Sequence, residues 1–330
     1  MQKTQPEFRI LVIRRDNIGD LICTTPLLAA LRRLLPQAWI GVLANDYNTS
    51  ILADNPDVDV VFAYRKAKHR AAGESRWSVW RDTAALLWRL RRMRLDLVLC
   101  ASPGARRFAQ LLGARRIVET DRAGDAHEVE ITCRLLAALD IAATPGPLVL
   151  WADPARRERM RIELGLPAQA ERRVALHISA RKPRQLGEAR IWPALARCLL
   201  RDGDADRILL FWAPGAEDDP LHPGDDGKAA RLLAELAGLP VTPVPTHELS
   251  ELVAGLSLAD AVVCSDGGAM HVAAGLGKPI VCFFGNSSAE RWHPWKVPYE
   301  LLQKRSQDVI DIGVDETLEA MRRLMVRTER

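Results

Sequence analysis

Residues 261–285 read AVVCSDGGAMHVAAGLGKPIVCFFG, and this stretch indicates how the chain folds. Two apolar runs, residues 261–264 and 280–284, have the length of buried strands and enclose a helical segment. Parallel neighbouring strands need a crossover connection of this kind, so the stretch predicts a strand–helix–strand unit of a parallel sheet. The polar turn after the first run contains two adjacent glycines, which is one more than a tight turn needs.

The same alternation of apolar runs and helical segments extends along the chain. Further strands are predicted at residues 8–14, 39–45, 58–64, 95–101, 173–180, 207–214 and 239–245. Because these runs are nearly continuous in apolar residues, they predict parallel sheets that are covered by helices on both faces.

The alternation stops at residues 143–154, ATPGPLVLWADP, where three prolines and a glycine predict an interdomain connection. At 330 residues the chain also exceeds the usual size of one hydrophobic core. We therefore predict two doubly wound α/β domains facing each other across a cleft, with ligands at the carboxyl ends of the strands. The predicted parts are a first domain at 1–150, a linker at 151–170, a second domain at 171–310 and a charged C-terminal helix at 311–330. One arrangement open to this helix is to pack back on the first domain.

The composition is that of an ordinary soluble protein, with 48% hydrophobic and 27% charged residues. A net charge of +4 is too small for a dedicated nucleic-acid binder and suits anionic small molecules or an anionic surface. The six cysteines have no CxxC spacing, which indicates buried free thiols in a reducing compartment. No signal-peptide core or membrane-spanning run occurs, so we expect a cytoplasmic monomer, at most peripheral to the inner membrane, with no nucleic-acid partner.

The glycine pair is the first candidate site. Gly267 and Gly268 leave main-chain amides bare at a helix start, which is the arrangement that binds phosphate, and Ser265 and Asp266 precede them. His271, one turn later, is able to point back to the same place. The alternative is a plain strand-to-helix turn capped by Asp266. No GxGxxG motif or Walker loop occurs, which argues against a dehydrogenase and a P-loop phosphotransferase.

Three other segments carry candidate groups. Asp20 follows the first strand and is able to accept a proton from a hydroxyl, although it could instead only cap a helix. Residues 177–190 carry several cations after a strand of the second domain, suited to a diphosphate or simply solvated. Residues 64–77 form a basic loop that either steers an anionic acceptor or is a solvated surface loop. The histidines show no metal-ligand spacing, so no metal site is predicted.

Taken together, these segments resemble glycosyltransferase family 9, the family of the ADP-heptose lipopolysaccharide heptosyltransferases. The resemblance is carried by DNIGDLICTTPLLAALRRLLP near the start and LADAVVCSDGGAMHVAAGLGKPIVCFFG near the end. It is strong across residues 10–60 and 255–295 and thin across residues 100–170. It implies a GT-B architecture of two Rossmann-like domains. It also implies inverting, metal-independent transfer of a sugar from a nucleotide-activated donor, usually ADP-heptose, to the lipopolysaccharide core or a related glycan, without a cofactor.

The resemblance also implies roles for individual residues. Asp20 matches the catalytic base, and the donor diphosphate site is matched by Asp266, Gly267, Gly268 and His271. The nucleotide base falls near Thr246 and His247, and Glu217 is a candidate for the ribose. Ser179 and the cations Arg181, Lys182 and Arg184 are assigned to the donor, and the acceptor cations are Arg65, Lys66, Lys68, His69 and Arg70.

Two departures from the family pattern leave alternatives open. Many members have Lys-x-Trp-Pro in the second domain, which Arg190 to Pro193 can match in place of the cations at 181–184. Glycine follows Asp266 where some members have threonine. The alternatives are a transferase for another nucleotide sugar, an epimerase of the same architecture and a nucleotide-sugar-binding protein on the same scaffold that has lost turnover.

Overall fold

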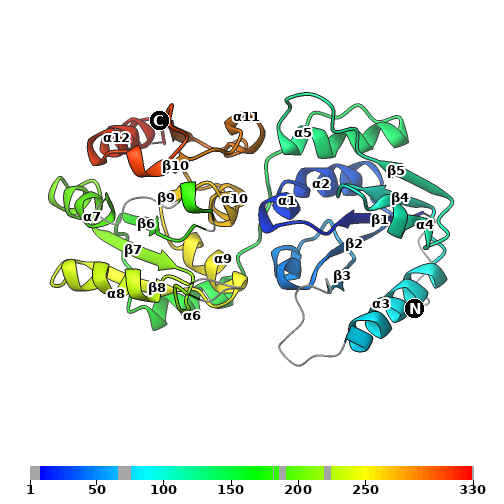
Figure 1. Cartoon of the computed structure of the whole chain (residues 1–330), viewed down its shortest axis with the longest axis horizontal. Coiled ribbons are helices and arrows are strands. Elements are labelled where there is room, and N and C mark those ends of the chain that lie inside the picture. The colour runs from blue at the N-terminus through cyan, green and yellow to red at the C-terminus, as the bar shows by residue number, and fades with distance from the viewer. Residues whose placement is uncertain (1–7, 66–75, 181, 186–190, 219–223, 329–330) are drawn as a thin grey trace. The chain divides into compact units, whose positions relative to one another are not determined.

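The chain folds into two α/β units, each built on a sheet of parallel strands (Figure 1). The computed structural model describes residues 8–65, 76–180, 182–185, 191–218 and 224–328. Contacts divide the chain between Trp151 and Ala152. The three prolines around this point explain why little regular structure crosses it, since proline lacks the amide that a strand ladder or helix needs.

Within its described residues, the first unit has a five-stranded sheet in the order β3-β2-β1-β4-β5, and all pairs are parallel. The strands are β1 (Arg9–Arg14), β2 (Trp39–Asn45), β3 (Val60–Tyr64), β4 (Leu97–Cys100) and β5 (Arg116–Glu119). The helices are α1 (Ile18–Ile22), α2 (Thr25–Leu34), η1 (Asp46–Leu52), α3 (Arg76–Arg92), α4 (Arg106–Gln110), α5 (Glu128–Cys133) and η3 (Arg134–Leu139). The predicted apolar runs of this half all contain a strand.

The described residues of the second unit contain a six-stranded parallel sheet in the order β11-β10-β9-β6-β7-β8. The strands are β6 (Arg173–His177), β7 (Arg207–Trp212), β8 (Val241–Pro245), β9 (Ala261–Ser265), β10 (Ile280–Phe284) and β11 (Tyr299–Gln303). The helices are α6 (Pro154–Glu163), η4 (Pro183–Gln185), α7 (Ile191–Arg201), α8 (Asp226–Glu235), α9 (Leu249–Ser257), α10 (Gly268–Gly275), α11 (Ala289–Trp292), η5 (Val309–Asp311) and α12 (Val314–Thr328). The predicted linker at 151–170 therefore contains a helix, α6, which packs on α9.

Alternate side chains of the second sheet form a core with α7, α8 and α12. The C-terminal helix contributes Leu318, Met321 and Leu324, which are spaced three residues apart and lie on one face. That face is buried against α7, β10 and β11 of its own unit. The apolar stripe of the C-terminal helix therefore completes the core of the second unit.

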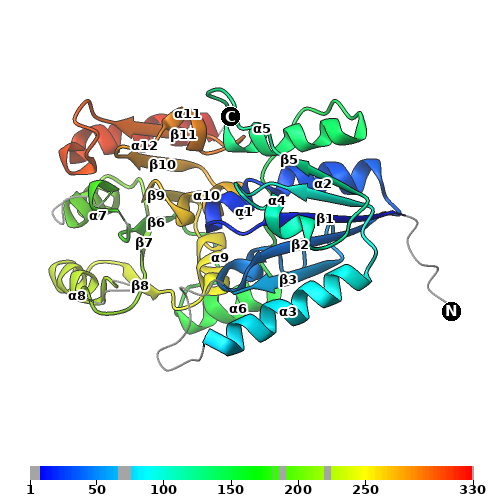
Figure 2. The same ribbon diagram turned by 45° about the vertical axis from the view of Figure 1, so that its right-hand side comes forward.

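Both sheets reverse their strand order at one point, between β1 and β4 and between β6 and β9. In doubly wound α/β sheets, ligands generally bind at the carboxyl ends of the strands beside such a point. Helix α1, which contains Asp20, follows β1, and the turn with Asp266 follows β9, so both lie at these points (Figures 1 and 2). The topology therefore brings the two strongest sequence candidates to the edge of each sheet where doubly wound folds bind ligands.

Candidate functional site

Asp20 lies in the short helix α1, directly after β1, and its side chain is 13% exposed. Its Oδ2 accepts hydrogen bonds from the main-chain and side-chain amides of Asn17, both at 3.2 Å. Its Oδ1 accepts a hydrogen bond from Nη2 of Arg14 at 2.7 Å. Asp20 therefore does cap its helix, as the alternative expected, but one oxygen is also held by a buried cation.

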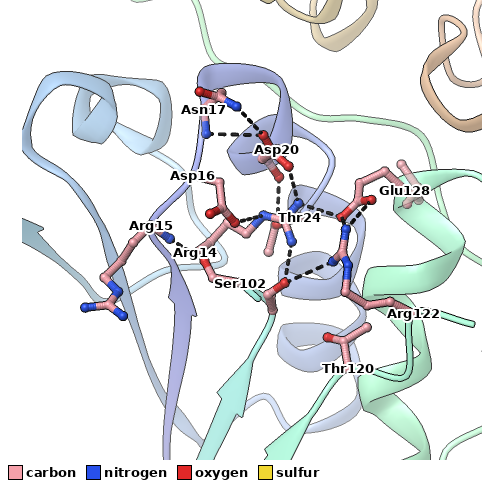
Figure 3. A network of polar contacts seen from close by, with 12 residues as sticks. Arg14, Arg15, Asp16, Asn17, Asp20, Thr24, Ser102, Thr120, Arg122 and Glu128 are labelled. Carbon is pink, nitrogen blue, oxygen red and sulfur yellow. Dashed lines mark hydrogen bonds and ion pairs between the residues drawn. The ribbon is translucent and has the colours of Figure 1, made fainter. Parts of the chain in front are cut away.

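Arg14 connects Asp20 to a second carboxylate that is far away in the sequence (Figure 3). Its Nη2 also donates to Oε1 of Glu128, at the start of α5, over 2.6 Å. Both side chains are completely buried. Glu128 in turn accepts a hydrogen bond from Nη2 of Arg122 at 2.9 Å. A third carboxylate, that of Asp16, lies 3.4 Å from Nε of Arg14. The network therefore contains two guanidinium groups and three carboxylates.

The charges in this network depend on one another. Burial by itself would lower the pKa of Arg14, but Asp20 and two further carboxylates raise it above its ordinary value. Arg14 therefore stays charged in a place where an isolated cation would be very costly. A rigid, charged arginine fixes the Asp20 carboxylate in one orientation, which is a requirement for a general base.

The glycine-paired turn joins β9 to α10 in the second unit. Ser265 and Asp266 are buried, and the Asp266 amide donates to the Phe283 carbonyl at 2.8 Å. Gly267 has an extended backbone, with φ 161°, which any residue is able to adopt. A Cβ placed on Gly267 would meet no atom within 4 Å. Open space, rather than backbone strain, thus distinguishes Gly267, as expected where a ligand approaches the main chain.

Hydrogen bonds hold the segment that follows β6 against this turn. Nε2 of Gln185 donates to Oδ2 of Asp266 at 2.7 Å, and the Gln185 carbonyl accepts from the Ser265 hydroxyl at 2.7 Å. A Cβ on Gly285 would lie 2.3 Å from the Arg184 carbonyl, so only glycine fits there. These contacts hold η4, which contains Arg184 and follows Lys182, beside the glycine pair.

The cations predicted for the donor are only partly described. Lys182 and Arg184 are exposed on either side of Pro183, at the carboxyl end of β6. Arg181, and Arg190 of the alternative match, lie outside the described residues. Lys182 and Arg184 are therefore the members of this set that the structure places near Asp266.

Other predicted donor residues lie at neighbouring strand ends. The Ser179 hydroxyl accepts a hydrogen bond from the Ala213 amide at 2.8 Å, which joins the ends of β6 and β7. Thr246 follows β8 and bonds to the Trp212 carbonyl, whereas the amide of exposed His247 donates to Glu251. Glu217 follows β7 and forms an exposed ion pair with Arg231 at 3.0 Å. All four lie at the carboxyl edge of the sheet.

His271 and the acceptor cations have different surroundings. His271 is buried, with 4% of its surface exposed, and its ring packs edge-on against Trp292 at 5.9 Å between centroids. Its role in the fold is therefore at least partly packing. Arg65 pairs with Asp46 at 3.2 Å. The remaining predicted acceptor residues, Lys66, Lys68, His69 and Arg70, lie outside the described residues.

Sequence reasoning missed several residues of both sites. Arg14, Glu128 and Arg122 are unremarkable in the sequence, and so is Gln185 beside its basic neighbours. Lys228 was also missed: it is buried, and its Nζ donates to the Ile178 carbonyl at 2.8 Å at the end of β6. A buried lysine at a ligand-binding strand end is a candidate anion contact, and burial lowers its pKa. The only sign of Lys228 in the sequence is its position, because it is a charged residue on an otherwise apolar face of α8.

Acid pH is expected to destabilise the second unit through His177. Burial is the main cause that lowers the pKa of His177 to about 4 from 6.5. The folded state keeps this histidine neutral while the unfolded chain is protonated below pH 6.5, so stability is lost as pH falls from 6.5 to 4. The loss amounts to ~3 kcal/mol. Urea unfolding across this range should show it, and His177→Gln should remove it, whereas His247→Gln at an exposed position should leave it unchanged; an equal slope in both variants would contradict the assignment.

Within the described residues, no group of three or more histidine, cysteine, aspartate or glutamate side chains is arranged to hold a metal ion. No helix in the described part of the chain has the length and apolar character to span a membrane. All six cysteines are free thiols; five of them are buried, as predicted, whereas Cys198 is half-buried.

Comparison with known families identifies the chain. The model of glycosyltransferase family 9 (heptosyltransferase) matches residues 103–319, which is more than half of the chain. The chain belongs to glycosyltransferase family 9. As a family 9 member it is a glycosyl-transferring enzyme, which confirms the family resemblance predicted from the sequence. The match also includes residues 103–170, where that resemblance is thin.

Individual relatives agree with this assignment. Lipopolysaccharide heptosyltransferase 3 of Escherichia coli is 23% identical over 297 residues, covering 84% of this chain and 83% of the relative. The structure of E. coli ADP-heptose LPS heptosyltransferase II superposes with a TM-score of 0.78 at 19% identity, covering 98% of this chain and 100% of the other. E. coli heptosyltransferase WaaC with ADP gives a TM-score of 0.76 at 19% identity, covering 96% and 100%. These similarities confirm the predicted GT-B fold of two Rossmann-like domains.

Proposed function

We propose that this family 9 enzyme transfers heptose from ADP-heptose to a hydroxyl of the lipopolysaccharide core or a related glycan. The names of the relatives support the sugar and the pathway, and ADP in the similar WaaC structure supports the nucleotide. The observation that carries the proposal is the Asp20 carboxylate, oriented by buried Arg14 at the switch point of the first sheet.

The proposed reaction is a single displacement with inversion. The acceptor hydroxyl attacks the anomeric carbon while Asp20 takes its proton, and the bond from that carbon to the diphosphate oxygen breaks. ADP leaves with the bonding electron pair. Oδ1 of Asp20 accepts a hydrogen bond from Arg14, which uses one of its two lone pairs, so the other is left for the incoming proton.

Negative charge on the departing diphosphate needs compensation, which we assign to the protein rather than to a metal. Main-chain amides at Gly267 and Gly268 begin helix α10, whose dipole favours an anion. Lys182 and Arg184 lie on the segment that Gln185 fixes to Asp266. Preorganised groups of this kind stabilise developing charge without reorganising during the reaction.

The remaining donor and acceptor assignments follow the strand ends. Thr246 and His247 after β8 are assigned to the adenine base, and Glu217 after β7 to the ribose. Arg65 and the cations after it are assigned to an anionic acceptor. The first unit offers Arg15 as well: its guanidinium lies over the rings of Tyr64 and Phe108, at 4.5 and 4.7 Å.

The decisive assay for the function is product formation. Purified enzyme with ADP-heptose and a panel of truncated core acceptors should yield a product heavier by one heptosyl residue in mass spectrometry. Activity should persist after extensive treatment with EDTA. Transfer from UDP- or GDP-linked sugars instead would replace the donor assignment. Binding of ADP-heptose without release of ADP in the presence of any acceptor would favour the binding-protein alternative.

A valine at Gly267 should separate donor binding from folding. Gly267→Val fits the free protein, because its backbone is extended and a Cβ meets nothing within 4 Å. A diphosphate against these amides would clash with the new side chain, so calorimetry should show ADP affinity at least about tenfold lower, or more than ~1.4 kcal/mol. The melting temperature should not change.

Gly146→Val is the matched control for this experiment. Gly146 also has open space for a Cβ, but it belongs to the first unit and not to the turn between β9 and α10. ADP should bind Gly146→Val as it binds the unmodified enzyme. If ADP bound both variants equally well, Gly267 would not belong to the diphosphate site.

A further inference from the structure

Helix α3 (Arg76–Arg92) has one face buried in the first unit and an unusual opposite face. Val79 and Leu90 are buried, and Leu86, Leu87 and Leu90 pack on the core of the sheet. These positions recur at helical spacing, so they account for the attachment of the helix. They leave the rest of its circumference to solvent.

Three tryptophans occupy the outward side of this helix. Trp77 is 84% exposed, Trp80 is 70% exposed and Trp88 is 62% exposed. Spacings of three and eight residues put them within one sector of a helix that turns 100° per residue. Tryptophan normally buries most of its surface, and exposed apolar groups gathered on one face mark an interaction surface.

Arginines surround this stripe, and acidic residues are nearly absent. The sequence of α3 contains five arginines and one acidic residue, Asp82. At the end of the helix, Arg9, Arg91, Arg92 and Arg94 line one surface hollow. Among the described residues, no carboxylate forms an ion pair with any of these four. The guanidinium of Arg92 instead lies over the ring of Trp88, at 4.6 Å. The positive charge next to the tryptophans is therefore not neutralised by the described part of the protein.

We propose that the outward face of α3 docks on a bilayer surface that contains anionic phospholipids. Tryptophan rings favour the boundary between headgroups and acyl chains, and arginines bind the phosphates above it. A basic helix with tryptophans on one face and a buried opposite face lies in the plane of such an interface. The inference rests on α3 alone; together with the proposed function it would place the enzyme beside a lipid-linked acceptor.

The arginines decide between a bilayer and a second copy of this chain. A homodimer contact would bring the four uncompensated arginines of one copy close to those of its mate, which is unfavourable. Anionic headgroups supply the missing negative charge, and tryptophan side chains have a favourable place beside them. The charge complementarity thus selects the lipid surface.

Flotation with vesicles tests the proposal without any measurement of activity, so its failure is independent of the proposed function. The full chain should float with vesicles of phosphatidylglycerol and phosphatidylethanolamine, and much less with phosphatidylcholine vesicles. Binding should weaken from 50 to 500 mM NaCl, because salt screens the arginine–headgroup attraction. The triple variant Trp77→Ser, Trp80→Ser, Trp88→Ser should bind at least about tenfold more weakly. Arg91→Gln with Arg92→Gln should also lose on the order of tenfold.

Matched variants control for general effects of these substitutions. Trp151→Ser removes a tryptophan that is 52% exposed outside α3. Arg33→Gln with Arg305→Gln removes two exposed arginines from other surfaces. Both controls should float like the unmodified protein. Equal flotation of the α3 and control variants would overturn the proposal, and so would no flotation of the unmodified protein. In sedimentation without lipid, a dimer that the triple tryptophan variant abolishes would also overturn it, in favour of a second copy.

Discussion

Asp20→Asn is expected to lower kcat by about 10²–10⁴-fold, while ADP binds with nearly unchanged affinity. The substitution keeps the shape of the side chain and a carbonyl oxygen toward Arg14, but an amide is unable to accept the acceptor proton. Arg14 retains Glu128, at 2.6 Å, so the fold should survive. Steady-state kinetics with ADP-heptose and the true acceptor, with calorimetry of ADP, give both quantities.

Asp125→Asn is a suitable control for this experiment. Asp125 is an exposed aspartate of the same unit, and its substitution removes the same charge from the chain. Its kcat should match that of the unmodified enzyme. Retention of near-full activity by Asp20→Asn would show that another group is the base, and equal loss of ADP affinity and kcat would show that Asp20 acts on binding.

Glu128→Ala is expected to lower the free energy of unfolding of the first unit by about 3–5 kcal/mol. Glu128 is completely buried and shares its carboxylate between Arg14 and Arg122. Removing it leaves the buried guanidinium of Arg14 with less compensation and opens a cavity next to α5. Urea unfolding followed by circular dichroism measures the change, and the transition of the first unit is the one to compare, since the two domains can unfold separately.

Glu119→Ala provides the comparison for Glu128→Ala. Glu119 is an exposed glutamate of the same unit at the end of β5, so its removal should change the unfolding free energy by less than ~0.5 kcal/mol. Similar values for the two variants would mean that the buried network does not stabilise the unit. A large loss of stability in Glu128→Ala alone would confirm that Asp20 is oriented by a structural element of the core.

The fold was largely predictable because its central strands are apolar runs. Runs such as residues 10–13 and 261–265 are buried on both faces of a parallel sheet, and they carry this information locally. The edge strands β5 and β11 were not predicted. They are half-exposed, with charged residues such as Arg116 and Glu300 among their apolar ones, so their sequences do not differ from those of loops.

The candidate site was predictable in part, for a similar reason. The turn with Asp266 and Gly267 combines a strand end, a helix start and bare amides within a few consecutive residues. The hydrogen bond from Gln185 to Asp266 was not predictable in this way. The two residues are 81 positions apart, and a single glutamine forms no distinctive sequence pattern. The two are brought together only by the pairing of β6 with β9.

The sequence by itself determined the strand–helix alternation, the position of Asp20 after the first strand and the placement of the glycine pair between a strand end and a helix start. These properties depend on neighbouring residues, whose spacing survives in the unfolded chain. Only the tertiary structure decided which groups orient those residues: Arg14 meets Glu128 across 114 positions. The outward face of α3 was likewise decided by packing, because burial of Leu90 and its neighbours fixes which side of the helix the tryptophans occupy.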